Sequence, residues 1–364
     1  MRRRPPPAVC LTRSRYFLWG MVVLGGPVAH AQHTPAPPNP LFTSHELLTL
    51  TIEAPFKKVF RERNQDPEQF PAVITYRDAE GVAVSVDLKL NTRGRFRLLR
   101  RTCNFPPIQL DLPKEDVDGT IFAGQNRIKL VTHCQNGREE YGQYVIQEYL
   151  VYRTFNLFTE LSFRVRLARI TYIDTDEEQD PLTRYAFLIE HKDDLAARTG
   201  WEILEIPVVP PDAFAQDNLT MVGVFQYMIG NTDFAFFKAS RGETECCHNA
   251  KALGTMAGPV FSVPYDFDMS GVINTRYSTV RAGFPIRNVR QRLFRGRCVE
   301  KGLLQQALRL FNQHRDAIHT LYREQPQLDE RVLEKTIEYY DDFYEIINDE
   351  RKTRREIEND CRRI

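Results

Sequence analysis

The sequence predicts an α+β protein with two lobes of unlike character. Segments with strand-like alternation gather in the first half, and segments with apolar residues at helical spacing gather in the last 70 or so residues. The chain has 364 residues, of which 42% are hydrophobic and 11% aromatic, enough for one large core or two ordinary ones. We therefore expect a strand-rich N-lobe over residues 45–190 and a helix-rich C-lobe over residues 191–364.

The N-terminus has the features of a secretory signal peptide. Residues 1–31 contain five arginines and no acidic residue, followed by an apolar run over 16–26 and the small-residue site Ala29-His-Ala31. The run is shorter than the roughly 20 residues that span a bilayer. We expect residues 1–31 to be cleaved, with an uncleaved anchor as the alternative, and residues 32–44 to be a Pro-rich linker.

The charge balance argues against nucleic acid as a partner. The formal net charge is +1, from 49 basic and 48 acidic residues. Five of the basic residues belong to the predicted signal, so the rest of the chain is mildly acidic, whereas nucleic-acid binders carry a basic excess. No later run is apolar enough to span a membrane, and the oligomeric state is not encoded in any pattern that we recognise.

Cysteine usage fits an exported protein. Six of the seven cysteines follow the predicted signal, and an even number in an oxidising compartment allows up to three disulfides in any of about 15 pairings. Cys103 with Cys134 is the preferred bridge because both flank predicted neighbouring strands. A zinc site at Cys246-Cys247-His248 is the alternative, although adjacent cysteines lack the usual two-residue gap.

The N-lobe is predicted to be a series of strands with one long helix. The acidic turn at 78–81 joins two alternating, β-branched segments into a hairpin. The expected strands are 47–54, 72–76, 82–90, 108–112, 127–131, 165–173 and 184–190, and the expected helix is 140–158.

The C-lobe is predicted to be mainly helical. A helix over 212–229 precedes two short strands at 248–253 and 260–265. From about residue 298 the chain reads as helical, and its last segment, 329–364, is a charged amphipathic helix. Two lobes of unlike character favour a cleft between them, a common place for a ligand.

Carboxylates and an amide in the C-lobe form the strongest chemical pattern. Asp233 follows a helix, Asn249 opens a strand, and Asp266 and Asp268 end the next strand on one face. Oxygen ligands of this kind suit Mg²⁺, and a further Asp can orient or deprotonate a hydroxyl nucleophile. The competing interpretation is that these residues only cap turns and helices.

The N-lobe supplies a matching set of basic residues. Five arginines fall within nine residues from Arg93, and Arg93 and Arg95 flank a glycine that permits a tight turn suited to phosphate. Lys129 lies within an apolar strand, from which it could reach a cleft and pair with Glu148 on the neighbouring helix. The alternatives are a solvated arginine turn and an outward-facing lysine.

The order of these motifs resembles CotH-type secreted protein kinases and is similar, more distantly, to HipA-type kinases. The motifs concerned lie within residues 85–275: the Arg93-Gly-Arg95 turn, the strand of Lys129, the helix of Glu148, the strand ending at Glu190, Gly230-Asn-Thr-Asp233, His248-Asn249 and Tyr265-Asp-Phe-Asp268. The resemblance implies a bilobal protein-kinase-like fold with ATP between the lobes. It also implies that Asp233 is the catalytic base and that Asn249, Asp266 and Asp268 hold Mg²⁺ or Mn²⁺. Arg93, Arg95, Lys129, Glu148 and Glu190 would then form the ATP site.

Asn249 lies 16 positions after Asp233, a longer spacing than in the compact loop of a HipA-type kinase. If Lys238 or Ser240 stands at the Asn position instead, no metal is expected. The predicted function is therefore an exported kinase that transfers the ATP γ-phosphoryl group to the hydroxyl of an unidentified protein. The alternative is an exported non-enzymatic surface protein or pseudokinase. A metal-dependent hydrolase built on Asp233, His248, Asp266 and Asp268 is a third hypothesis.

Overall fold

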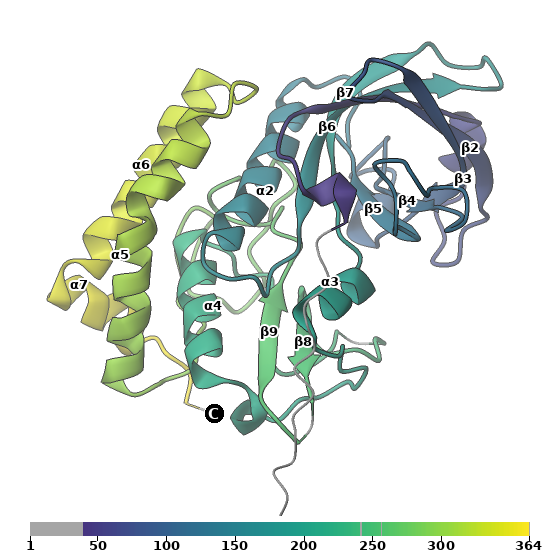
Figure 1. Cartoon of the computed structure of the whole chain (residues 1–364). Coiled ribbons are helices and arrows are strands. Elements are labelled where there is room, and N and C mark those ends of the chain that lie inside the picture. Colours follow the sequence, from purple (N-terminus) through teal and green to yellow (C-terminus); the bar gives the residue numbers. More distant parts are fainter. Residues whose placement is uncertain (1–38, 241, 256, 364) are drawn as a thin grey trace, which may run out of the picture. The chain divides into compact units, whose positions relative to one another are not determined.

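Seven strands from the first half of the chain close into a single β-barrel (Figure 1). The computed structural model describes residues 39–363 except 241 and 256, so the predicted signal peptide and most of the predicted linker lie outside the described residues. The strands are β1 (Leu48–Ala54), β2 (Phe70–Arg77), β3 (Ala83–Thr92), β4 (Ile108–Asp111), β5 (Arg127–Val131), β6 (Val165–Asp174) and β7 (Leu182–Ile189).

The barrel closes through its first strand. Around the barrel the order is β1-β2-β3-β4-β5-β7-β6, and β6 returns to pair with β1. Every neighbouring pair is antiparallel except β1 with β6, which is parallel and runs from Leu48 opposite Ala168 to Ala54 opposite Asp174.

The closed barrel shows that the predicted bilobal protein-kinase-like fold is wrong. The individual strands lie close to their expected positions, but their arrangement differs. Closure depends on a parallel pairing between segments 120 residues apart, Leu48 with Ala168. Strand patterns in a sequence indicate which face of a strand is buried, and they do not indicate which distant strand it pairs with.

The barrel interior is filled by alternating aliphatic side chains. Ile74 of β2 and Leu90 of β3 are both fully buried in it. The hairpin between these strands has the register Phe70 opposite Leu90 through Arg77 opposite Ala83. This register places the apolar set of both strands on the inner face, as the period-2 alternation requires.

One part of the barrel wall is buried on both faces. Phe187 and Leu188 are neighbours on β7, so their side chains point to opposite faces, and both are fully buried. Leu188 packs inside the barrel, whereas Phe187 packs against the helices outside it. The continuous apolar run at the end of β7 reflects this double burial.

Helices and one small sheet cover that wall. The helix α2 packs against β6 and β7, α5 packs against both α2 and α4, and α6 lies along α5 (Figure 1). The helices are α1 (Phe56–Val59), α2 (Glu140–Asn156), α3 (Lys192–Thr199), α4 (Gln216–Met228), α5 (Lys301–Arg323), α6 (Glu330–Ile347) and α7 (Glu350–Thr353). The antiparallel pair β8 (Ala250–Gly254) and β9 (Val260–Pro264) forms a separate two-stranded sheet.

The C-terminal segment is interrupted rather than one continuous helix. The helix α6 ends at Ile347, and Asp349 then caps α7 by accepting hydrogen bonds from the backbone N–H groups of Arg351 and Lys352, at 2.8 and 2.9 Å. A short Asp side chain bonds the backbone better at a helix start than within a helix, so it favours a new start here.

Three disulfides join the six cysteines. Cys103–Cys134 confirms the expected bridge, and the other two are Cys246–Cys247 and Cys298–Cys361. Cys246 and Cys247 bind each other, so they are not placed as zinc ligands. The three bonds are consistent with an oxidising compartment. Within the described part of the chain, no helix combines the length and the apolar character that crossing a membrane requires.

Candidate functional site

One cavity of about 380 Å³ brings together residues from the barrel and from the helical half. Its lining contains six of the nine residues that the sequence singled out, although they are spread over some 175 positions of the chain. These are Arg93, Arg95, Asp233, Asn249, Asp266 and Asp268. Lys129, Glu148 and Glu190 do not line the cavity, although Lys129 lies beside the lining residue Tyr265 and Glu148 beside the lining residue Arg97.

Asp233 sits at the centre of a hydrogen-bond network. His248 Nε2 donates to its Oδ1 at 2.9 Å, and Asn249 Nδ2 donates to its Oδ2 at 3.1 Å. Burial opposes ionisation of this carboxyl, but the hydrogen bonds from His248 and Asn249 outweigh it and hold the pKa of Asp233 below its ordinary value. Asp233 is therefore an oriented, ionised carboxylate at neutral pH.

The side-chain oxygen of Asn249 accepts no hydrogen bond among the described residues. Its Nδ2 also donates to the backbone oxygen of Asp233 at 2.7 Å, so both contacts with Asp233 use the amide nitrogen. The residue has a positive φ of 51°, a conformation that Asn tolerates better than most residues. The side-chain oxygen of Asn249 is the atom that remains for a cation.

Asp266 and Asp268 follow the end of β9 and differ in exposure. The side chain of Asp266 is 42% exposed and that of Asp268 is 8% exposed. The backbone N–H of Asp266 donates to the Tyr152 hydroxyl at 2.8 Å, and its φ is 62°. Burial raises the pKa of Asp268 to about 6, against the opposing effect of the nearby Arg97. Asp266 is thus the carboxylate more open to a ligand.

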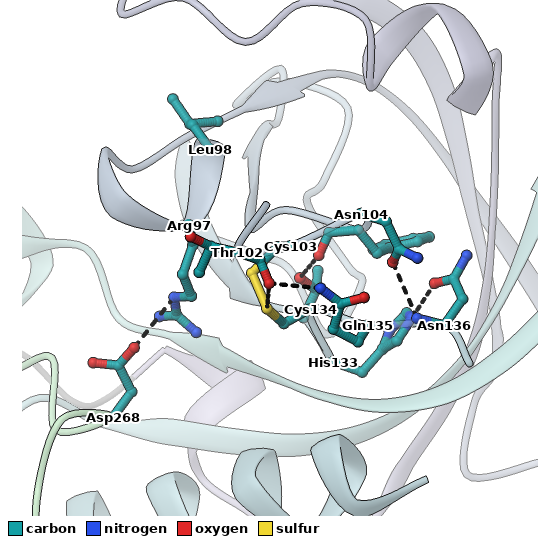
Figure 2. Close-up of a disulfide and its surroundings, with 12 residues drawn as sticks. Arg97, Leu98, Thr102, Cys103, Asn104, His133, Cys134, Gln135, Asn136 and Asp268 are labelled. Atoms are coloured by element: carbon teal, nitrogen blue, oxygen red, sulfur yellow. Dashed lines mark hydrogen bonds and ion pairs between the residues drawn. A yellow bond between two sulfur atoms is a disulfide. The ribbon is translucent and has the colours of Figure 1, made fainter. Parts of the chain in front are cut away.

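Arg97 joins three carboxylates from two different elements. Its guanidinium lies 3.5 Å from Asp266, 3.5 Å from Asp268 and 3.9 Å from Glu148 of α2. Figure 2 shows its side chain extending from the short helix at Phe96–Leu98 toward Asp268. The Arg97 side chain is 10% exposed, so these charges interact with little screening from water.

The turn that carries these arginines needs a glycine. Gly94 has a φ of +98°, a backbone conformation that residues with a Cβ adopt only with strain. Through this turn Arg93 and Arg95 line the cavity. Arg95 forms an ion pair with Glu243 at 3.1 Å, and its side chain is 55% exposed.

The Cys103–Cys134 disulfide fixes the C-terminal end of the same turn (Figure 2). Beside it, Gln135 Nε2 donates to the backbone oxygen of Thr102 at 2.6 Å, and Phe105 N–H donates to the backbone oxygen of Cys134 at 3.0 Å. The bridge ties the arginine turn to the segment that follows β5. The disulfide therefore constrains the end of the segment that carries Arg97.

Lys129 does not form the expected pair with Glu148. Lys129 Nζ lies 5.2 Å from the centre of the Tyr265 ring and has no hydrogen bond or ion pair among the described residues. Removal from water, followed by the nearby charges of Arg93 and Lys251, lowers the pKa of Lys129 to about 7. An anion at this position would restore the charged ammonium form.

Glu148 and Glu190 have structural partners. Burial raises the pKa of Glu148 well above its ordinary value, and its ion-pair partner is Arg97. Glu190 is bound by Arg198, whose Nε and Nη2 lie 2.9 and 3.0 Å from its carboxylate. Because this pair is buried and Glu190 does not line the cavity, the structure gives no support to an ATP contact through Glu190.

The oxygen atoms of this site suit a hard cation whose remaining ligands come from a substrate and from water. No cluster of three or more His, Cys, Asp or Glu side chains suited to a metal occurs in residues 39–363, leaving out the two undescribed positions. Asn249, Asp266 and Asp268 nevertheless line one cavity and offer an amide oxygen and two carboxylates. Mg²⁺ commonly binds through one or two carboxylates together with phosphate oxygens and water, so this set fits it.

Two features of the site were not assigned from the sequence. In the sequence Arg97 is one member of an arginine-rich run, and no pattern indicates that it is the buried arginine of that run. Ser240 was considered only as a replacement for Asn249, whereas its hydroxyl lies 2.7 Å from His248 Nδ1. The spacing of the motifs indicated the cavity, but the partners of its side chains depend on the fold.

No model of a known protein family matches the chain, and no curated protein matches it.

Proposed function

We propose that this protein is an exported phosphotransferase that uses ATP with Mg²⁺ or Mn²⁺ and transfers the γ-phosphoryl group to a protein hydroxyl. The observation that carries the proposal is that two chemical kinds of side chain line one cavity. Arg93, Arg95 and Arg97 are the basic ones, and the oxygen-bearing ones are Asp233, Asn249, Asp266 and Asp268. The volume of about 380 Å³ is within the usual range of small-molecule sites.

The basic side chains would bind and orient the phosphates. Arg93 and Arg95 present guanidinium groups suited to bidentate contact with phosphate oxygens. Lys129 has a pKa of about 7, and a neighbouring phosphate would keep it protonated. Phosphoryl transfer depends mainly on such positioning and charge stabilisation.

The oxygen-bearing side chains would hold the cation and orient the acceptor hydroxyl. Asn249, Asp266 and Asp268 would bind Mg²⁺, whose contribution is to neutralise charge on the phosphates. Asp233 is held ionised by His248 and Asn249, so its carboxylate can accept a hydrogen bond from a substrate hydroxyl and aim it at the phosphate.

The proposal rests on these side chains and not on a kinase-like fold. The similarity of the motif order to CotH-type secreted kinases supports the same activity. Export is part of the proposal because residues 1–31 carry the pattern of a signal peptide and the described part of the chain holds three disulfides.

Replacing Asp266 with Ala tests the metal role. We expect Asp266→Ala to weaken Mg²⁺-dependent ATP binding at least about tenfold, because it removes the more exposed of the two carboxylates that follow β9. Isothermal titration calorimetry with and without Mg²⁺ measures this. Asp342→Ala, an exposed carboxylate on α6, is the matched control and should bind as the wild type does. Unchanged affinity in Asp266→Ala would remove the metal role.

Replacing Asp233 with Ala tests the base. We expect Asp233→Ala to bind Mg-ATP normally and to lose transfer by about 10²–10⁴-fold, the usual contribution of general acid–base catalysis. Phosphate transfer to a dephosphorylated casein acceptor is the measurement. Transfer at the wild-type rate would exclude this role for Asp233.

A non-enzymatic role is the rival, and the ion pairs of Arg97 favour it. A guanidinium 3.5 Å from both Asp266 and Asp268 already compensates the charges that a cation would neutralise. Thermal unfolding separates the two functions. A ligand at 100 times its Kd stabilises the folded state by about 2.7 kcal/mol, so the enzyme should melt at a higher temperature with Mg-ATP. No shift at millimolar nucleotide would favour the surface-protein role.

A further inference from the structure

The cavity contains a hydroxyl group of the protein itself. Ser240 lines it together with Asp233 and His248. Ser240 belongs to the stretch between Asp233 and Asn249, which is longer than the compact loop of a HipA-type kinase. This stretch places a protein hydroxyl where the proposed reaction needs one.

Hydrogen bonds connect Ser240, His248 and Asp233 in a row. An ionised carboxylate can only accept, so His248 Nε2 carries the proton that is donated to Asp233 Oδ1 at 2.9 Å. In the neutral ring the other nitrogen, Nδ1, then has a free lone pair, and the Ser240 hydroxyl donates to it at 2.7 Å. Asp233 therefore fixes the tautomer in which His248 can accept the proton of Ser240.

Ion pairs hold the segment of Ser240 against the rest of the site. Glu243 pairs with Arg95 at 3.1 Å, and both residues line the cavity. Glu245 pairs with Lys192 at 2.7 Å and with Lys251 at 2.6 Å. These ion pairs fix the part of the chain that follows Ser240.

We propose that Ser240 is a phosphoryl acceptor in cis, modified by the nucleoside triphosphate bound in this cavity. The inference rests on the phosphotransferase function proposed above and extends it to a modification site. Arg93 and Arg95 are close enough to line the same space, so a phosphate on Ser240 would lie among guanidinium groups.

The chemical step balances with ATP as the only co-reactant. The Ser240 Oγ forms a bond to the γ-phosphorus while the bond from that phosphorus to the β–γ bridging oxygen breaks. The bridging oxygen keeps the electron pair, and ADP leaves. The hydroxyl proton passes to His248 Nδ1, and the resulting imidazolium remains paired with the Asp233 carboxylate.

The test incubates the full chain with Mg²⁺ and γ-labelled ATP and locates the label by phosphopeptide mapping. We expect the label on Ser240, with a first-order rate constant that does not change when the protein is diluted. Ser240→Ala should lose this label. Ser85→Ala, which replaces an exposed serine on β3 outside the cavity, should be labelled like the wild type.

A parallel assay with dephosphorylated casein separates this inference from the proposed function. Labelled casein with unmodified Ser240 would overturn the inference and leave the phosphotransferase standing. A Ser240 labelling rate that rises with protein concentration would overturn transfer in cis. Folded wild-type protein that labels neither casein nor itself would overturn both.

Discussion

At the scale of single residues, Arg97 decides the electrostatics of the site. Its one positive charge faces Glu148, Asp266 and Asp268, and two of these carboxyls have raised pKa values because they are buried. Without a cation nearby, carboxyls this close would share protons rather than all ionise. Arg97 opposes this rise in pKa and holds the three carboxyl groups in place before any ligand arrives.

Removing that charge should destabilise the fold. Arg97→Met leaves the buried carboxylates without their partner, and we expect the free energy of unfolding to fall by about 3 kcal/mol or more. Urea denaturation measures it. The control Arg101→Met changes an exposed arginine of the same run and should shift stability by less than about 0.5 kcal/mol. Equal effects of the two variants would show that Arg97 has no special role.

The chemical types at the site could be predicted from the sequence, and their pairings could not. Asp233, Asn249 and Asp266 fall at the ends of apolar segments, and such ends meet at the edges of a core. Lys129 was assigned to Glu148 because a strand and the next helix are usual neighbours. In the structure Glu148 pairs with Arg97 instead, at 3.9 Å, and Lys129 lies over the ring of Tyr265.

At the scale of elements, the segment from residue 234 to 249 shapes the cavity wall. It carries Ser240, His248 and Asn249, and Glu245 anchors it. Burial raises the pKa of Glu245, but hydrogen bonds from Lys192 and Lys251 outweigh it and lower the pKa to about 2. This anchor should be sensitive to acid.

The pH dependence of Glu245→Gln has a definite sign. The pKa of Glu245 is lower in the folded state than in the unfolded chain, so its stabilising effect is complete above its ordinary value of 4.5 and is lost as the pH falls toward about 2. We expect Glu245→Gln to melt at a lower temperature than the wild type at pH 7, with the difference vanishing near pH 2. Thermal unfolding monitored by circular dichroism measures it.

The exposed turn residue Glu80 provides the control. Glu80→Gln should follow the wild type at every pH, because no ion pair holds that side chain among the described residues. A melting difference for Glu245→Gln that stays constant from pH 7 to pH 2 would contradict the anchor role.

Element boundaries were predictable where local patterns dominate. The expected hairpin at 72–90 is β2 and β3, and the expected helix at 140–158 is α2, because alternation and helical spacing are local properties. The segment after residue 329 was expected to be one helix, and it breaks at Asn348 because Asp349 starts a new one. Caps of this kind are short-range signals that a long amphipathic pattern conceals.

At the scale of the whole molecule, one part of the barrel wall contributes to two hydrophobic cores, one inside the barrel and one among the helices. β5, β6 and β7 close the barrel on one face and pack against α2 and the helices behind it on the other. The cavity lies where turns from the barrel meet loops from the helical half. A wall shared by both cores limits the relative movement of the two sides of the site.

The C-terminal helices are tied to this arrangement by the third disulfide. Cys298 and Cys361 are separated by 63 positions and enclose α5 and α6. In the chain-entropy model, removing a cross-link over a loop of this length costs about 4 kcal/mol. We expect the double variant Cys298→Ala/Cys361→Ala to lose about that much stability in urea denaturation.

The wild-type protein under non-reducing conditions is the reference for that variant. Reducing agent should lower the stability of the wild type toward that of the variant, and any remaining difference would reflect the other two bridges. A double variant as stable as the wild type would show that packing of α5 and α6 alone fixes the C-terminus.

The architecture was the part that the sequence could not provide. A strand-rich half followed by a helix-rich half is compatible with an open sheet over a helical lobe and equally with a barrel packed on helices. The difference lies in one strand pair, β1 with β6. No local pattern in Leu48–Ala54 or Val165–Asp174 states that these two segments lie side by side.

That same pair governs the order in which the protein can assemble. Leu48 and Ala168 are 120 positions apart, so β1 has no partner on its β6 side until β6 has been synthesised. Pairings of such long sequence separation form slowly, because the chain entropy of closing the loop must be overcome first. Until then, β1 presents an unpaired edge, which is the surface that a holding chaperone would be expected to cover during synthesis.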